Sequence, residues 1–163
     1  MHHSRKDTFH QVEFRLATLA DIDGLVELFH AFFSESTLPR LGLVYDPARM
    51  ARWLEKVIGS GLQPHLIAIA KDSDEIVGSI DYVLDHSHTT APNASLNRFY
   101  VRPHWRLSAI GRVLLDLMLE EAKADGAVAF RAGLSSGIQG ARNLFVHAGF
   151  TPTPYSILLA RKL

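Results

Sequence analysis

The spacing of apolar residues changes along this 163-residue chain, and this change limits the possible fold more than any other feature. Between Ile22 and Phe33 apolar residues recur three and four positions apart, as in a helix that faces a core. Between His65 and Leu84 two β-rich runs flank the polar turn 71–75, which predicts a hairpin. Strand-like and helix-like segments then alternate to the end. This mixed order predicts an α+β or α/β sheet with helices on both faces, and it argues against a helical bundle or a β-sandwich.

Capping residues and chain breakers set the expected boundaries of the elements. Thr18 with Asp21 forms a capping box before the first helix, and Asp46 with Pro47 supplies a cap and a first-turn proline for the second. The predicted elements are, in chain order, a strand at 12–17, a helix carrying 22–33, a loop at 34–45, a helix from 46 to 59, strands at 65–70, 76–84 and 95–101, a helix carrying 110–118 that is ended by Gly126, a strand at 127–132, a helix carrying 141–148 that is ended by Gly149, and a strand at 155–161.

Composition excludes several classes of function. The chain has 17 Lys and Arg against 17 Asp and Glu, and a net charge of zero argues against a nucleic-acid partner, whose binding needs a basic face. No apolar run approaches the roughly 20 residues of a membrane helix, and no signal-like segment begins the chain, so we expect a cytoplasmic protein without a membrane partner. The absence of cysteine excludes disulfides, thiolate metal sites and a cysteine nucleophile. The 47% of hydrophobic residues suffice for a single domain over 1–163, with 1–11 expected to be disordered.

The segment from Val101 to Arg112 is the best candidate for a binding site. It leaves a strand, turns through small residues and opens the clearest amphipathic helix of the chain. The small side chains of Ser108, Ala109 and Gly111 leave the first free N–H groups of that helix accessible to an anion. Nearby arginines add positive charge, so a phosphate or pyrophosphate is the expected ligand. An ordinary strand-to-helix turn, in which small residues only aid packing, explains the same spacing.

This segment resembles motif A of the Gcn5-related N-acetyltransferase superfamily, which reads (R/Q)-x-x-G-x-(G/A) and often follows V-x-P-x-x. Residues 101–111 read V-x-P-x-x-R-x-x-A-x-G, with Ala109 where the family prefers glycine. Residues 76–78, Ile-Val-Gly, are similar to the family's strand after the hairpin turn. Residues 141–150 read A-x-x-L-F-x-x-x-G-F, similar to its A-x-x-(L/F)-Y-x-x-x-G-F. The resemblance extends from about Val12 to Leu163.

The resemblance implies a mixed, mostly antiparallel, twisted sheet that splays between two strands, with helices on both faces. It implies transfer of an acetyl group from acetyl-CoA to an amine. The pyrophosphate would bind the amides of 107–112, and the pantetheine arm would pair with 99–101 in the gap toward the strand at 127–132, with the Val101 N–H polarising the thioester carbonyl. The residues that it assigns to acetyl-CoA are Phe99, Tyr100, Val101, Arg106, Leu107, Ser108, Ala109, Ile110, Gly111 and Arg112.

One departure from the family concerns the proton donor for the leaving CoA thiolate. The family often places a tyrosine where this chain has Phe145, which has no proton to give. Tyr155 is the candidate that we assign to this role, and Tyr100 and Ser135 are alternatives.

Asp81 and Asn97 are the candidates for taking up the amine's proton or anchoring the amine, because both are expected near the centre of the sheet. Asp85 and Glu35 are further candidates. For each of these residues, a solvated polar group at a strand or helix end explains the sequence as well.

No metal site is expected. His86 and His88 lie on one face of an extended segment beside Asp85, but a zinc site needs a third and a fourth ligand, and a polar loop explains the same residues.

The sequence therefore predicts an N-acetyltransferase acting on a primary amine of a small molecule. Without cysteine no acetyl-cysteine intermediate can form, so the amine should attack directly in a ternary complex. The alternatives are a CoA-binding regulatory module with little or no turnover, and a peptide or protein N-acetyltransferase. The late apolar residues 157–159 suggest a homodimer.

Overall fold

The computed structural model describes residues 11–87, 89–106, 108–133 and 139–153. Within these ranges, five strands form one sheet in the order in which they occur in the chain. They are β1 (Val12–Leu16), β2 (His65–Ala70), β3 (Glu75–Asp85), β4 (Asn93–Val101) and β5 (Ala129–Arg131). The first three pairings are antiparallel and β4 pairs with β5 in parallel, so the expected mixed, mostly antiparallel sheet is confirmed.

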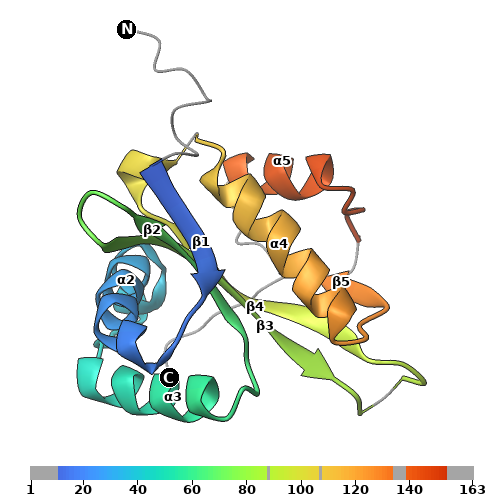
Figure 1. The fold of residues 1–163 in the computed structure, drawn as a ribbon, viewed down its shortest axis with the longest axis horizontal. Helices are drawn as coiled ribbons and strands as arrows, with labels where there is room; N and C mark the ends of the chain where they lie inside the picture. Colours follow the sequence, from blue (N-terminus) through green and yellow to red (C-terminus); the bar gives the residue numbers. More distant parts are fainter. Residues whose placement is uncertain (1–10, 88, 107, 134–138, 154–163) are drawn as a thin grey trace, which may run out of the picture.

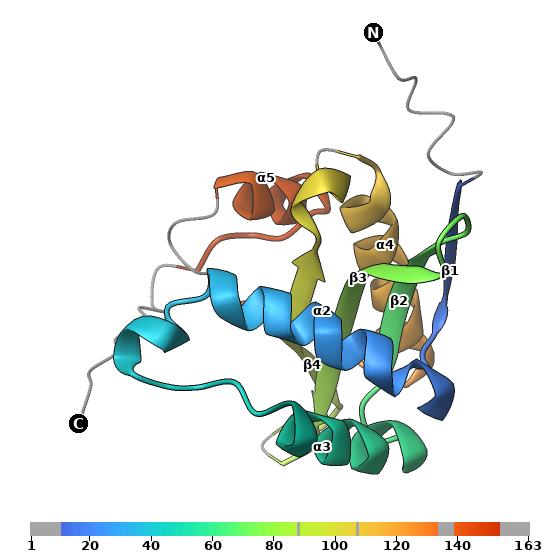
Figure 2. The same ribbon diagram turned by 90° about the vertical axis from the view of Figure 1, so that its left-hand side faces the viewer.

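Helices cover both faces of this sheet, as expected (Figures 1 and 2). They are α2 (Ile22–Glu35), α3 (Pro47–Gly59), α4 (Ile110–Ala124) and α5 (Gln139–His147). Helices α2 and α3 pack on one face, while α4 packs on the other and the α5 residue Phe145 joins its core cluster. None of the helices described is both long enough and apolar enough to span a membrane.

The predicted caps explain where the helices begin and end. The Asp46 carboxylate accepts a hydrogen bond from the Arg49 N–H at 2.9 Å and starts α3, with Pro47 in its first turn. The Thr18 N–H donates to Asp21 at 2.7 Å around a 3₁₀ turn, Leu19–Asp21, that leads into α2. Gly126, with φ of 88°, follows α4, as a left-handed C-terminal residue should.

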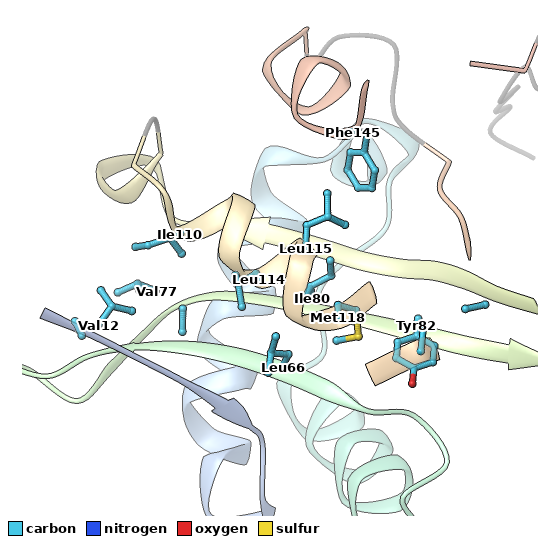
Figure 3. Close-up of a cluster of buried hydrophobic side chains, with 14 residues drawn as sticks. Val12, Leu66, Val77, Ile80, Tyr82, Ile110, Leu114, Leu115, Met118 and Phe145 are labelled. Carbon is cyan, nitrogen blue, oxygen red and sulfur yellow. The ribbon is translucent and has the colours of Figure 1, made fainter. Parts of the chain in front are cut away.

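The alternation of β2 divides the core into two layers. Every residue of β2 is buried; Leu66, Ala68 and Ala70 join the cluster beneath α4, whereas Ile67 and Ile69 join the cluster beneath α2 and α3. Figure 3 shows the first cluster, in which side chains of α4 face those of β2 and β3. Each fully buried Leu or Ile contributes roughly 1.5–3 kcal/mol relative to an exposed one, so both layers hold the sheet in place.

The structure differs from the expected elements in a few places. The segment 34–45 is only partly a loop, because α2 continues to Glu35 and a 3₁₀ turn covers Leu38–Leu41. The fixed φ of Pro39 suits that turn, and Gly42, with φ of 81°, ends it. Strand β4 starts at Asn93, two residues earlier than expected, and β5 is shorter than 127–132. The strand expected at 155–161 lies outside the described residues.

Candidate functional site

The sheet opens between β4 and β5, as the resemblance implies. These two strands pair only at Asn93–Ser95 of β4 and Ala129–Arg131 of β5, although β4 continues to Val101. Beyond Ser95, β4 keeps its partner β3 on one side, while its pairing with β5 has ended. Among the described residues, the second half of β4 therefore borders a gap in the sheet, and the turn after β4 leads to the start of α4.

The peptide groups of Phe99 and Val101 face this gap. The Arg102 N–H donates to the Val77 carbonyl of β3 at 2.8 Å, so alternation along an antiparallel strand turns the Tyr100 N–H toward β3 and those of Phe99 and Val101 away from it. The Val101 carbonyl accepts a hydrogen bond from Arg106 Nε at 2.8 Å on that outer side, which agrees with this orientation. An extended molecule in the gap would meet this edge as a further strand.

The first turn of α4 closes the far end of the gap. The Ser108 hydroxyl donates to the Trp105 carbonyl at 2.5 Å, and the first helical bond runs from the Val113 N–H to the Ala109 carbonyl at 3.0 Å. The N–H groups of Gly111 and Arg112 precede that bond, so they have no partner within the helix and point out of its N-terminus, where an anion is favoured. Leu107 lies outside the described residues.

Ala109, the departure from the motif A consensus, and Gly111, which matches it, have different surroundings in the structure. Ala109 is the N-cap residue with φ of −73°, so an alanine causes no backbone strain there. Gly111 lies between β4 and α5: a Cβ built on it would lie 3.4 Å from Phe99 Cζ and 3.5 Å from Leu144 Cδ2. The side chain of Ile110 is buried in the core and anchors this turn.

Arg106 belongs to a cluster that joins α2 to β4. Its NH2 donates to Glu35 Oε2 at 2.7 Å, the Tyr100 hydroxyl donates to the other oxygen of Glu35, and the guanidinium lies 5.2 Å from the centre of the Tyr100 ring. An open cavity of about 430 Å³ lies beside this cluster, lined in part by Glu35, Tyr100, Arg102 and Trp105.

The contacts in this cluster bear on two of the candidates for proton transfer, Glu35 and Tyr100. Although burial acts to raise it, hydrogen bonds from Tyr100 and Arg106 hold the pKa of Glu35 below its usual value, so Glu35 is a poor base. Burial, and then the Glu35 carboxylate, raise the pKa of Tyr100 to about 12, and its proton is committed to Glu35. Neither residue suits proton transfer at neutral pH.

Arg112 ties α4 to α5. Its Nε lies 2.7 Å from Asp116 Oδ2 one turn later, and its NH1 donates to the His147 carbonyl at 3.2 Å. Both predicted arginines are thus present at the site, but each is already paired with a carboxylate.

Asp81 and Asn97, both predicted as catalytic residues, are in direct contact. Asp81 is fully buried on β3, and its Oδ2 accepts hydrogen bonds from Asn97 Nδ2 at 2.7 Å and Gln63 Nε2 at 2.5 Å. A β-bulge makes the contact: the register passes from Asp81 opposite Arg98 to Tyr82 opposite Leu96, so Asn97 is the extra residue. A bulge re-aims side chains, which is how Asn97 and its neighbour Arg98 both reach Asp81.

Gln63, His65 and Arg98 complete this polar cluster and were not predicted. The His65 Nδ1–H donates to the Gln63 carbonyl at 2.8 Å, so its Nε2 is an acceptor, and this atom lies 3.8 Å from Asp81 Oδ1. Burial lowers the pKa of His65, which keeps the ring neutral. Arg98 lies with its guanidinium 4.3 Å from the Trp53 ring and its NH1 3.8 Å from Asp81 Oδ2. The sequence held one indication of this cluster, because His65 is the polar residue at the start of the otherwise apolar strand β2.

Phe145 and Asp85, the other candidates that the structure describes, make contacts elsewhere. Phe145 is only 2% exposed and packs edge-on against Phe99 and Phe150, so the position carries a buried apolar ring. Asp85 accepts from the Ser87 N–H at 2.8 Å in the turn after β3. Tyr155 and Ser135 lie outside the described residues.

No group of three or more potential metal ligands gathers in the part of the chain that the structure describes. His88, one of the two histidines considered for such a site, lies outside that part.

The fold is shared with acetyltransferases of known structure. A probable acetyltransferase has a TM-score of 0.75 and 21% identity over 91% of this chain and 99% of that one. An aminoglycoside acetyltransferase from an uncultured soil metagenomic sample, in complex with sisomicin, gives 0.73 and 15% over 95% and 98%. A predicted acetyltransferase with acetyl-CoA from Clostridium acetobutylicum gives 0.69 and 18% over 91% and 96%.

Comparison of the amino-acid sequence with known families identifies the family to which the chain belongs. No curated protein matches the chain. The model of the acetyltransferase (GNAT) family, by contrast, matches residues 23–150, which is most of the chain and runs from the second residue of α2 to beyond the end of α5. The chain belongs to the acetyltransferase (GNAT) family.

Proposed function

We propose that this protein transfers an acetyl group from acetyl-CoA to a primary amine of a small molecule. The observation that carries the proposal is the second half of β4, which among the described residues has no strand partner on its outer side and leads to the N–H groups of the first turn of α4, which have no partner within the helix. That combination offers a strand edge for the pantetheine amides and a helix N-terminus for the pyrophosphate. A similar structure that was solved with acetyl-CoA supports the choice of co-substrate.

The residues of this chain have distinct roles in the proposed reaction. The N–H groups of Phe99 and Val101 face the gap and would donate hydrogen bonds to the bound molecule, and that of Val101 is our candidate for polarising the thioester carbonyl. The neutral amine attacks the carbonyl carbon directly, a carbon–nitrogen bond forms and the carbon–sulfur bond breaks, the nitrogen releases one proton to solvent water, and the sulfur takes up one proton. Tyr155 is the proposed proton donor, because Phe145 has none.

A small amine is the acceptor class that we favour. Two of the similar structures are named as acetyltransferases of an aminoglycoside and of glucosamine-6-phosphate, which are both small molecules with an amino group. The cavity of about 430 Å³ beside Glu35 and Tyr100 lies within the range of pockets that hold such molecules.

A second candidate is a CoA-binding module without turnover. Phe145 is a buried apolar ring without a proton to give, and the Tyr100 hydroxyl donates its proton to Glu35. None of these three residues therefore offers a proton to the leaving thiolate. In this second candidate function, the protein binds acetyl-CoA but does not transfer its acetyl group.

One experiment separates the two candidates. Thiol release from acetyl-CoA is followed with a panel of amino acids, amino sugars, aminoglycosides and polyamines, and binding of acetyl-CoA is measured by calorimetry. The proposal expects saturable binding and CoA release that depends on one class of amine. Binding without release on any amine would favour the second candidate, and no binding together with no thermal stabilisation would reject both, since a ligand of the native state must stabilise it.

A further inference from the structure

Asp81 is placed to hold another residue and not to touch the acceptor. Its side chain is fully buried on β3, one strand away from the open edge of β4. Its Oδ2 already accepts two hydrogen bonds, from Gln63 and Asn97, and its Oδ1 faces the buried His65. Because neighbouring strands lie about 4.8 Å apart, β4 separates Asp81 from any molecule in the gap.

Asn97, in contrast, is exposed and lies on β4 just where the pairing with β5 has ended. The bulge turns its amide toward Asp81, which it reaches at 2.7 Å. Asp81 Oδ2 accepts hydrogen bonds from the amides of both Asn97 and Gln63, so the end of the Asn97 amide that faces it is the NH₂ group. The carbonyl oxygen Oδ1 is therefore the end of the Asn97 amide that is left for a donor from outside.

The cluster around Asp81 is built to keep this arrangement fixed. Gln63 binds the same carboxylate oxygen as Asn97, and Arg98 lies 3.8 Å from it while its guanidinium stacks over Trp53 at 4.3 Å. His65 stays neutral because burial lowers its pKa, so it does not draw Asp81 into an ion pair of its own. A buried carboxylate with this many partners is held in one orientation, and it holds the Asn97 amide that it binds in one orientation as well.

We propose that Asn97 Oδ1 accepts a hydrogen bond from a second N–H group of the amine substrate, not from its reacting nitrogen, and that Asp81 is a positioning residue that orients the Asn97 amide. The inference rests on the proposed acetyl transfer and deepens it by naming a group that recognises the acceptor. It assigns Asp81 no proton transfer. The chemical class recognised is a small molecule with a second ammonium or amine group, as in a polyamine or an aminoglycoside.

The test compares the variants Asn97→Ala, Asp81→Asn and the double variant, with Asp72→Asn in the exposed β2–β3 turn as a matched charge control. Steady-state kinetics are measured with an amine that the wild type acetylates. Asn97→Ala should raise KM for the amine about tenfold, the effect of one hydrogen bond to a charged donor, and should lower kcat less. Asp81→Asn should raise the same KM about threefold and leave the pH profile of kcat/KM in place. In the Asn97→Ala background it should have no further effect.

Each result decides the inference. An amine KM for Asn97→Ala within twofold of the wild type overturns it while the proposed function stands. A fall in kcat of about a hundredfold in Asp81→Asn, together with loss of the acidic limb of the pH profile of its residual activity, also overturns it, because Asp81 would then be the base. Because Asn97 is exposed, its variant tests the inference even if the buried substitution at Asp81 does not fold. Absence of turnover in the wild type with every amine overturns the proposed function and this inference with it.

Discussion

Replacing Gly111 tests the placement of the acetyl-CoA site most sharply, because this residue lies where β4, α4 and α5 meet. A Cβ at this position would lie 3.4 Å from Phe99 Cζ and 3.5 Å from Leu144 Cδ2, which is ordinary contact. Alanine therefore fits. It should stabilise the helical position by about 0.5–1 kcal/mol, raise Tm by about 1–4 °C, and leave the Kd for acetyl-CoA within threefold of the wild type.

Leucine at Gly111 adds three more carbons, and they have nowhere to go except into Phe99, Leu144 or the gap itself. Overpacking of this kind costs about 1–3 kcal/mol, and a side chain that takes up the gap imposes that cost on bound acetyl-CoA, so its Kd should rise about 5- to 150-fold. Calorimetry gives the Kd, and thermal unfolding shows whether the variant is folded. Gly59→Leu in α3 is the matched control, since a Cβ there meets only Leu19 Cδ2, at 3.7 Å. If Gly111→Leu binds acetyl-CoA with a Kd within twofold of the wild type, the site does not lie beside this turn.

Three further predictions concern charged groups. Arg106→Ala, which removes the ion pair with Glu35, should weaken acetyl-CoA binding about tenfold and make it less dependent on salt; an unchanged salt dependence would remove Arg106 from the phosphate site. The hydrogen bond from Arg15 lowers the pKa of Asp21 to about 2, so Asp21 stabilises the fold above its ordinary value of 3.8 and loses this effect as the pH falls toward 2. Because Arg15 is half-exposed, Asp21→Asn should lower the free energy of unfolding by only about 1–2 kcal/mol at pH 7 and by nearly nothing near pH 2, as urea titrations would measure. Burial lowers the pKa of His65 from 6.5, so as the pH falls the unfolded chain takes up this proton at a higher pH than the folded protein does. The free energy of unfolding of the wild type should therefore fall by up to about 1.4 kcal/mol per pH unit below pH 6.5. The variant His65→Gln should lack this part of the pH dependence.

The parts of the fold that depend on local sequence could be predicted. The capping carboxylate of Asp46, the β2–β3 hairpin and the helix from Ile110 each follow from residues that lie close together in the chain. The same holds for the turn into α4, because its small residues and its strand are adjacent in sequence. The parting of β4 and β5 came from the family resemblance, and it is confirmed.

The contacts that shape the candidate site could not be predicted, because they join residues that are distant in sequence. Glu35 reaches Arg106 across 71 positions and Tyr100 across 65, and no local pattern encodes either contact. The same is true of the bulge at Asn97, which depends on how β3 and β4 align. Sequence reasoning found Asp81 and Asn97 separately, and only the fold shows that one holds the other.

The central claim is that acetyl-CoA adds to the open edge of β4, and hydrogen exchange of the β4 amides tests it directly. In the free protein the Tyr100 N–H is turned toward β3, whereas those of Phe99 and Val101 face the gap. Saturation with acetyl-CoA should slow exchange at Phe99 and Val101 by at least tenfold and leave Tyr100 as it was. Saturation by acetyl-CoA with unchanged exchange at Phe99 and Val101 would contradict the account, because the ligand would then be bound elsewhere.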